Sequence, residues 1–336
     1  MDKTFIIAEI GQAHDGSLGI AHSYIDALKD TGINAIKFQT HIAVAESSPF
    51  EKFRVKFSYK DKTRFDYWKR MEFNFEEWVS LKKHCEDVGL EFISSPFSCK
   101  AVDLLEKLNV NKYKVGSGEV NNLLLINKIC ETKKEIYLSS GLSSFEEINR
   151  TLDFIKKKKN NNKLSIFQCT SKYPTIPEDW RLNLINIMKK KYDLPVGYSD
   201  HSGDIYACLS AVNQGASLIE FHVVFDKKMF GPDSSSSLDL SQVRQLVNGV
   251  RMIEKSINVK SQSKDFEGII KMKQLFEKSL CLNKDLQKGH KINIEDLDAK
   301  KPKGMGFDAN DFQNLIGKKL NKNKKQWSFV KPEDLI

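Results

Sequence analysis

The sequence predicts an α/β protein whose main domain is a (β/α)8 TIM barrel, followed by a small β-rich tail. Short apolar runs alternate with amphipathic helical stretches, and this strand–helix unit occurs eight times. The units fill about 250 residues, which is the usual size of such a barrel. A doubly wound open sheet is the main alternative, but eight units favour closure because fewer usually suffice for an open sheet.

The expected strands are short runs of apolar and branched residues. They cover residues 5–9, 35–39, 91–95, 112–115, 135–139, 164–169, 195–197 and 217–222. The expected helices carry apolar residues at helical spacing. They lie near residues 18–31, 76–89, 99–108, 121–132, 144–158, 180–192, 203–214 and 239–256. Each strand therefore precedes a helix, as parallel strands require.

One segment, from about residue 42 to 75, interrupts this alternation. It is rich in charged and aromatic residues, including Phe53, Tyr67 and Trp68. A long segment after the second strand lies on the face of the barrel that carries active sites. We expect it either to cover the site as a lid or to pack on the barrel rim.

The expected domain boundaries follow from where the alternation stops. A catalytic barrel would cover residues 1–260, and a linker around 258–276 would lead to a small domain over 277–336. A domain of about 60 residues is only marginally stable alone. The tail is therefore expected to dock on its own barrel or on that of a partner.

The composition indicates a globular protein without a membrane segment. Hydrophobic residues make up 40% and charged residues 29% of the chain, which is ordinary for such proteins. There is no apolar run near the ~18 residues of a membrane span and no signal-peptide pattern at the N-terminus. The six cysteines lack CxxC spacing, which indicates reduced thiols in the cytoplasm.

The formal net charge of +9 raises the question of nucleic acid as a partner. The lysine runs lie near predicted helix ends, where they favour the helix dipole. No aromatic residues interleave with them to form a stacking platform. We therefore expect no nucleic-acid partner, whereas an anionic small-molecule substrate agrees with the charge.

Two histidines follow neighbouring predicted strands. His201 comes after the seventh strand and His222 ends the eighth. In one parallel barrel both imidazoles can point into the same mouth. Two histidines and a carboxylate can hold a divalent ion and leave positions open for water or substrate. The pair therefore predicts a metal site.

Two lysines, Lys37 and Lys114, lie within strand ends together with several hydroxyl residues, Ser117, Ser139 and Ser199. Lysines inside a barrel require a compensating anion, and ammonium groups beside hydroxyls suit a phosphate or carboxylate ligand. Two alternatives stay open. In the first, each lysine pairs with Glu119 or another acid. In the second, one lysine forms a Schiff base after its neighbour lowers its pKa.

Six short motifs at strand ends occur in a fixed order. They are IAEIG at 7–11, KFQT at 37–40, SPF at 95–97, YKVGSGE at 113–119, SDH at 199–201 and GPD at 231–233. The set resembles the sialic acid synthase (N-acetylneuraminate synthase) family over nearly the whole chain. The tail resembles the C-terminal antifreeze-protein-like (SAF) domain of that family.

This resemblance implies a reaction. Phosphoenolpyruvate would condense with an N-acyl hexosamine to a nine-carbon 2-keto sugar acid, with release of phosphate and with Mn²⁺ or Mg²⁺ as cofactor. It also implies a domain-swapped homodimer, in which the tail of one subunit reaches over the barrel mouth of the other.

The resemblance also assigns residues by position. The metal ligands would be His201 and His222, and the catalytic groups would be Asp15, Glu119 and Asp233. The phosphoenolpyruvate site would comprise Lys37, Lys114, Ser117, Ser139 and Ser199, with Gln39 and Tyr173 lining the remaining pocket.

The chain departs from the family pattern toward the sugar. Lys301 stands where many bacterial relatives carry an arginine that contacts the acetamido group, and lysine lacks the planar fork of arginine. Asp15 matches a position often occupied by glutamate. N-acetylmannosamine is the expected acceptor. A diacetamido-trideoxyhexose, giving legionaminic- or pseudaminic-type acids, and a sugar without the acetamido group are alternatives.

Two interpretations of other kinds are also considered. A Schiff-base aldolase would use pyruvate with Lys114 or Lys37, and neither phosphate release nor sensitivity to chelators would be observed. A noncatalytic sugar- or ice-binding protein would have no need for an interior lysine pair, which argues against that interpretation.

Overall fold

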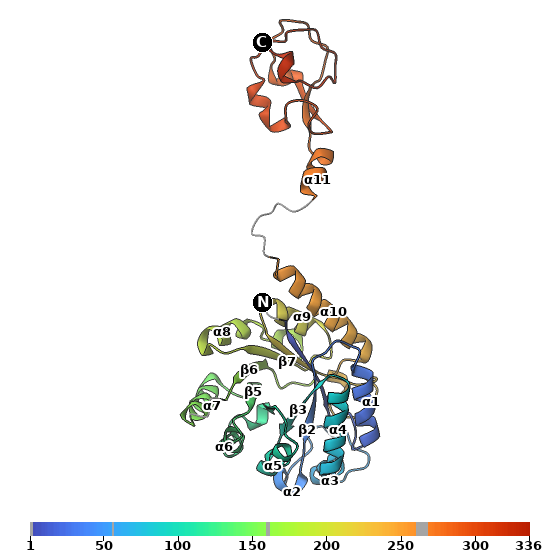
Figure 1. Cartoon of the computed structure of the whole chain (residues 1–336), viewed down its shortest axis with the longest axis vertical. Coiled ribbons are helices and arrows are strands. Elements are labelled where there is room, and N and C mark those ends of the chain that lie inside the picture. The colour runs from blue at the N-terminus through green and yellow to red at the C-terminus, as the bar shows by residue number, and fades with distance from the viewer. Residues whose placement is uncertain (1–2, 56, 159–161, 260–267) are drawn as a thin grey trace. The chain divides into compact units, whose positions relative to one another are not determined.

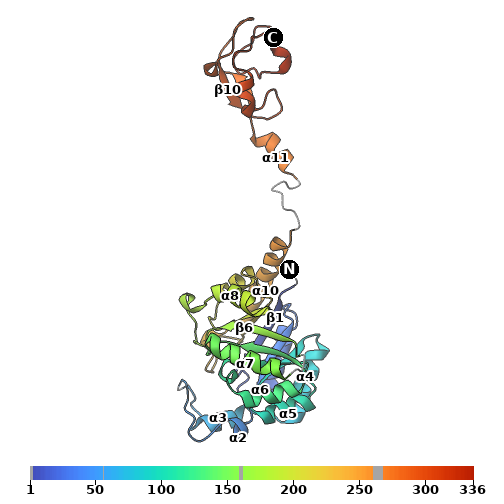
Figure 2. The same cartoon turned by 90° about the vertical axis from the view of Figure 1, so that its left-hand side faces the viewer.

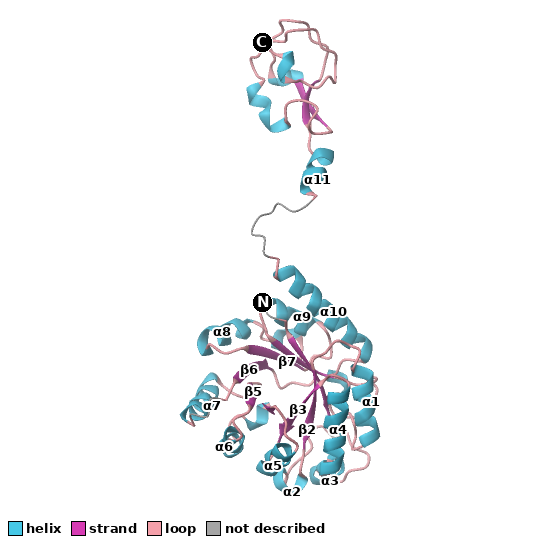
Figure 3. Ribbon diagram, in the orientation of Figure 1, coloured by secondary structure: helices cyan, strands magenta, loops and turns pink. Residues whose placement is uncertain are grey.

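The computed structural model describes residues 3–55, 57–158, 162–259 and 268–336. The chain divides into two compact units, Met1–Val259 and Lys260–Ile336, and each is described by itself. The first unit is a closed barrel of eight parallel strands in sequence order, with helices around its outside (Figure 1, Figure 3). The predicted TIM barrel is therefore confirmed.

All eight predicted strand–helix pairs are present. The strands are β1 (Phe5–Gly11), β2 (Ala35–Thr40), β3 (Glu91–Pro96), β4 (Lys112–Val115), β5 (Glu135–Ser139), β6 (Leu164–Cys169), β7 (Val196–Asp200) and β8 (Leu218–His222). The helices that follow them are α1 (Leu18–Leu28), α4 (Phe75–Asp87), α5 (Cys99–Lys107), α6 (Leu123–Glu131), α7 (Phe145–Lys157), α8 (Asn183–Tyr192), α9 (Tyr206–Asn213) and α10 (Leu240–Ile257). In the described ranges no helix has the length and apolar character needed to cross a membrane.

The outer helices are fixed by side-chain caps and by apolar inner faces. Ser144 forms a capping box with Glu147 at the start of α7, which satisfies two backbone donors that the helix leaves free. Ile148, Leu152 and Ile155 then recur at helical spacing and are buried. Helices α6 and α7 lie side by side on the outside of the barrel (Figure 2).

The barrel interior has two layers, because side chains of a strand alternate in direction with a period of two. The layer toward the N-terminal strand ends is apolar and comprises Ile7, Ala35, Ile93, Tyr137, Phe167 and Leu218. Two residues further along the same strands stand Glu9, Lys37, Ser95, Ser139, Cys169 and Glu220, all of which are buried. Polar groups thus face inward toward the C-terminal strand ends, where active sites of this fold lie.

The segment after β2 is folded and contains two helices, α2 (Ala43–Glu46) and α3 (Arg64–Met71). Ala43, Tyr67, Trp68 and Met71 form a small core of their own. We call residues 42–74 the insertion. Its side chains also border the cavity described below, so it both packs as a unit and forms a wall of the site.

The second unit is small and contains a two-stranded antiparallel sheet, β9 (Ser279–Leu282) with β10 (Leu297–Lys300). Its core comprises Leu280, Leu282, Leu286, Ile292, Leu315, Leu320 and Val330. Residues 260–267 of the expected linker lie outside the described residues. The rest of that linker includes a helix, α11 (Ile269–Phe276), which the sequence pattern did not predict.

Candidate active site

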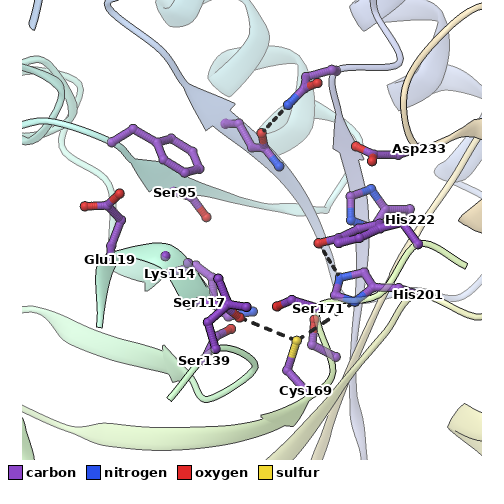
Figure 4. A pocket seen from close by; sticks show the side chains of 18 of the residues that line it. Ser95, Lys114, Ser117, Glu119, Ser139, Cys169, Ser171, His201, His222 and Asp233 are labelled. Carbon is purple, nitrogen blue, oxygen red and sulfur yellow. Dashed lines mark hydrogen bonds between the residues drawn. The ribbon is translucent and has the colours of Figure 1, made fainter. Parts of the chain in front are cut away.

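A cavity of about 640 Å³ lies at the C-terminal ends of the barrel strands. Most side chains expected at the site line it, namely Lys37, Gln39, Lys114, Ser117, Glu119, Ser139, Tyr173, Ser199, His201, His222 and Asp233. Figure 4 shows Lys114, Ser117 and Ser139 together on one side of the cavity. The same view places His201, His222 and Asp233 on the other side.

The two lysines are buried and neutralised by acids. Lys114 Nζ lies 2.8 Å from each oxygen of Glu220. Lys37 forms an ion pair with Glu9 and lies 3.7 Å from Glu220 Oε1. Pairing with acids, one of the expected arrangements, is therefore present, but the partners are Glu9 and Glu220 and not Glu119. The four buried charges sum to zero.

Burial opposes the charged form of each of these groups, and the neighbouring opposite charges favour it. Burial raises the pKa of Glu220, but Lys114 and Lys37 outweigh it and lower that pKa to about 2. Burial lowers the pKa of Lys37, yet Glu220 and Glu9 raise it above the ordinary value. For Lys114 burial prevails, and its pKa is lowered. Lys37 therefore holds its proton more firmly than Lys114.

Small polar groups converge beside Gly141. A Cβ on Gly141 would lie 2.5 Å from Ser171 Oγ, 2.7 Å from Ser117 Oγ and 2.9 Å from Cys169 Sγ, so a side chain there would have to displace these groups. The Gly141 N–H donates to Ser117 Oγ over 3.2 Å. Hydroxyl groups that converge near buried ammonium groups suit the oxygens of an anion.

The histidine pair lies at the ends of β7 and β8, with ring centroids 5.4 Å apart. His201 Nδ1 lies 2.9 Å from the Thr170 carbonyl oxygen. A carbonyl only accepts, so Nδ1 of His201 carries a proton. The Tyr173 hydroxyl oxygen lies 3.1 Å from Nε2 of the same ring.

The two imidazoles differ in protonation. Burial lowers the pKa of His222 to about 4, so this ring is neutral near pH 7. Burial also opposes charge on His201, but Cys169 and the Thr170 carbonyl outweigh it and raise its pKa to about 9. The neutral His222 ring offers a lone pair in the form that metals bind.

The donor chemistry of the pair fits a divalent ion. Imidazole nitrogens bind such ions, and the Thr170 carbonyl accepts from Nδ1 of His201, as partners of metal-binding histidines commonly do. A third protein ligand is not in place. Among the described residues, no group of three or more His, Cys, Asp or Glu side chains is arranged to hold a metal ion.

Asp233, the carboxylate expected beside the histidines, is bound to an arginine of the insertion. Its Oδ1 lies 2.7 Å from Arg54 Nη2. The guanidinium carbon of Arg54 lies 4.1 Å from the centroid of the Tyr173 ring, within the range of a cation–π contact. Arg54 therefore connects Asp233 with the tyrosine that holds His201.

Three further expected residues have different surroundings. Glu119 lines the cavity and accepts a 2.7 Å hydrogen bond from Asn122, and burial raises its pKa. Asp15 does not line the cavity, because its carboxylate lies 2.6 Å from Arg70 Nη1. Lys301 belongs to the second unit, where its Nζ lies 4.8 Å from the centroid of the Phe276 ring.

A chain of hydrogen bonds ties the insertion to the floor of the cavity. The Tyr67 hydroxyl donates to Gln12 Oε1 over 2.9 Å. Gln12 Nε2 donates to Gln39 Oε1 over 3.2 Å, and Gln39 Nε2 donates to Glu9 Oε1 over 3.0 Å. The insertion therefore positions Gln39 relative to the buried charges.

Sequence reasoning assigned no role to Glu9, Glu220, Cys169 or Arg54. A signal for the two glutamates was available, because each stands two residues after an inward-facing apolar residue and two buried lysines require two acids. Cys169 occupies the equivalent position in β6. Arg54 gave no signal, since the insertion has no regular period.

Comparisons with known proteins identify the family of this chain. Residues 24–262 match the model of the NeuB family. The N,N'-diacetyllegionaminic acid synthase of Campylobacter jejuni is 31% identical over 337 residues, which cover 98% of this chain and 100% of the relative. The human N-acetylneuraminate-9-phosphate synthase is 32% identical over 321 residues, covering 94% of this chain and 88% of the relative.

A solved structure shows the same fold. The N-acetylneuraminic acid (sialic acid) synthetase of Leptospira borgpetersenii, in complex with citrate, matches with a TM-score of 0.71 and 30% identity. The match covers 81% of this chain and 90% of that chain. The chain therefore belongs to the NeuB family and is an enzyme of the sialic acid synthase type.

Proposed function

We propose that this enzyme condenses phosphoenolpyruvate with an N-acetylmannosamine-like sugar and releases phosphate. The product would be a nine-carbon 2-keto sugar acid, a sialic acid or an analogue. The observation that supports this most is the division of one cavity into two ends. Buried lysines and converging hydroxyls form one end, and the histidine pair and Asp233 form the other.

The residues at the first end would bind the anionic donor. Lys37 and Lys114 would pair with phosphate or carboxylate oxygens, and Ser117, Ser139 and Ser199 would donate hydroxyl hydrogens. The lysines act as charges and form no covalent bond. The hydrogen bonds from these lysines and serines would hold C3 of phosphoenolpyruvate toward the sugar at the opposite end of the cavity.

The reaction itself balances without an oxidant or a reductant. The C3 carbon of phosphoenolpyruvate bonds to the aldehyde carbon of the open-chain sugar, water adds at C2, and phosphate leaves by cleavage of the C–O bond. Glu119 and Asp233 would handle the proton of that water or of the sugar oxygen. The raised pKa of Glu119 suits a group that takes up and returns a proton near neutral pH.

We further propose that His201 and His222 hold a divalent ion, Mn²⁺ or Mg²⁺. When bound, the ion would polarise the carbonyl oxygen of the sugar as a Lewis acid. The neutral His222 ring and the orientation of the His201 ring, whose Nδ1 is held by the Thr170 carbonyl, support this assignment. The role of Asp233 would be to act beside the ion on a water molecule or on the sugar.

A diacetamido-trideoxyhexose is the second candidate acceptor, and it would give a legionaminic- or pseudaminic-type acid. The end-to-end similarity to the Campylobacter jejuni N,N'-diacetyllegionaminic acid synthase supports it. Lys301 supports it as well, because it stands where the resemblance leads us to expect an arginine that contacts the acetamido group of the sugar. Both acceptors fit the same reaction.

We also propose a domain-swapped homodimer in the cytoplasm, with residues 277–336 acting as an antifreeze-like SAF domain over the partner's barrel. Apolar side chains of α11 support a partner surface, since Ile270, Leu275 and Phe276 are 70%, 63% and 60% exposed. Cys85, Cys99, Cys169, Cys208 and Cys281 are free thiols, which agrees with a reducing compartment.

The test is phosphate release from phosphoenolpyruvate with Mn²⁺. N-acetylmannosamine, mannose and diacetamido-trideoxyhexoses serve as acceptors, each with and without a chelator. Release that depends on one sugar and stops with chelator supports the proposal and identifies the acceptor. If pyruvate supports product formation and no phosphate is released, the Schiff-base aldolase replaces it.

A further inference from the structure

The insertion meets the loop between β8 and α10 beside the histidine pair. Arg54 Nη2 lies 2.7 Å from Asp233 Oδ1 and 3.4 Å from the Pro232 carbonyl oxygen. Next to this ion pair, the Phe57 and Phe230 rings have centroids 5.5 Å apart. Among the described residues, the insertion is therefore joined to this loop by the Arg54–Asp233 ion pair, by the contact of Arg54 with Pro232, and by the rings of Phe57 and Tyr59 against Phe230.

Arg54 and Tyr173 together engage groups at the proposed metal site. Arg54 binds the Asp233 carboxylate, while the Tyr173 hydroxyl under its guanidinium lies 3.1 Å from His201 Nε2. Both engaged atoms are ones that a divalent ion between His201 and His222 would attract. The cation Arg54 thus lies where the charge of the ion would act.

A guanidinium and a divalent ion compete for the same carboxylate. The Asp233 side chain is 15% exposed and that of Arg54 is 44% exposed. A partly exposed ion pair contributes little to stability, so a doubly charged ion displaces it readily. The Arg54–Asp233 ion pair is therefore poorly suited to a purely structural role and well suited to replacement of the guanidinium by a divalent ion.

We propose that Arg54 is a positioning residue that competes with the divalent ion for Asp233, so that binding of the ion releases the insertion from the β8–α10 loop. This rests on the metal site of the proposed function. Thermodynamic linkage makes the effect reciprocal. If docking of the insertion weakens binding of the ion by some factor, then binding of the ion weakens docking of the insertion by the same factor. The insertion would then close tightly on the metal-free cavity and open on the loaded one.

The first test measures Mn²⁺ affinity of the full chain by electron paramagnetic resonance, in the parent protein, in Arg54→Ala and in Arg64→Ala. Arg64 is a matched control: it lines the same cavity, but its Nε lies 3.4 Å from Glu51 and not near Asp233. Arg54→Ala is expected to bind Mn²⁺ about fivefold more tightly or better, and Arg64→Ala about as the parent does. Equal or weaker binding by Arg54→Ala, or equal tightening in both variants, overturns the proposal.

The second test measures hydrogen exchange in peptides that cover residues 47–55. Without metal, Arg54→Ala is expected to exchange faster than the parent, and adding Mn²⁺ to the parent should have the same effect. An insertion that exchanges no faster with Mn²⁺ overturns the release. If the parent binds no Mn²⁺ at all, the metal part of the proposed function fails together with this inference. If it binds Mn²⁺ and the variants match it, only this inference fails.

Discussion

Both carboxylate oxygens of Glu220 lie 2.8 Å from the ammonium nitrogen of Lys114. The residues come from β8 and β4, so their contact spans the interior of the barrel. Lys114 is 2% exposed and Glu220 is 4% exposed. The pair therefore fixes the position of a lysine that points into the cavity, and Lys114 favours the charged form of Glu220.

Removing one charge of this pair should destabilise the barrel. We expect Glu220→Gln to lower the free energy of unfolding by about 3–5 kcal/mol, because it leaves a buried ammonium without its counter-charge. Unfolding in denaturant measures this loss of free energy. Glu135→Gln is the control: Glu135 is 28% exposed and lies 3.5 Å from Lys112, so its loss should cost less than about 1 kcal/mol. Similar small losses in both variants would contradict the prediction.

Lys114→Met should weaken use of the anionic donor. The Michaelis constant for phosphoenolpyruvate is expected to rise about tenfold or more, since a hydrogen bond to a charged group contributes about 1.5–3 kcal/mol. The Michaelis constant for the sugar should change little. Steady-state kinetics with each substrate varied in turn separates the two, and an unchanged donor constant would remove Lys114 from the anion site.

His222→Ala should abolish metal-dependent turnover and leave the fold intact. Phosphate release with and without Mn²⁺ and the thermal unfolding temperature are the two measurements. His84→Ala is the control, because His84 lies in α4 on the outside of the barrel, 2.8 Å from His22. Full activity of His222→Ala would refute the metal assignment.

The second unit should unfold in acid. Burial raises the pKa of both Asp296 and Asp334, but hydrogen bonds outweigh it, led by Lys284 and Lys322 respectively, and each pKa is about 2. Since the unfolded value is about 3.9, each carboxylate contributes stability above about pH 4. That contribution is lost as the pH falls toward about 2.

Methyl resonances of Leu282 and Val330, followed by NMR between pH 5 and pH 2, report this transition. Asp296→Asn should flatten the dependence on pH. Asp298→Asn is the control, because Asp298 is 49% exposed and its nearest ammonium is 3.8 Å away. An Asp296→Asn variant with the parent's pH dependence would contradict the assignment.

Deleting residues 277–336 should impair use of the sugar if the tail completes the site of a partner subunit. The measurement is phosphate release at saturating phosphoenolpyruvate over a range of acceptor concentrations. Circular dichroism checks that the truncated barrel is folded. An equally active truncated barrel would show that the site lies in the barrel alone.

The fold could be predicted because local pattern and architecture agree. Each strand is a short apolar run and each helix has a periodic apolar face, so eight repeats specify a barrel. The exceptions are local. Strand β7 extends to Asp200 although Ser199 and Asp200 are polar, because both face enclosed parts of the barrel. The helix α11 was missed because its apolar residues are largely exposed and do not form a buried stripe.

The site was predictable where it follows from strand ends. His201, His222, Lys37 and Lys114 lie at the ends of strands and meet in one cavity for that reason. Arg54 could not be found in this way. It reaches Asp233 across 179 positions of sequence, through an irregular segment whose path no local pattern encodes.

The balance of four charges inside the barrel also restricts how this protein can change over time. A substitution that removes Lys114 alone leaves the buried Glu220 carboxylate with too little positive charge around it. A substitution that removes Glu220 alone leaves the buried Lys114 ammonium with too little negative charge around it. Either single step passes through a less stable protein, whereas a simultaneous change of both restores neutrality. Amino-acid replacements at Glu9, Lys37, Lys114 and Glu220 should therefore be accepted in matched pairs, and a mutant library that varies these positions one at a time should contain mostly destabilised members.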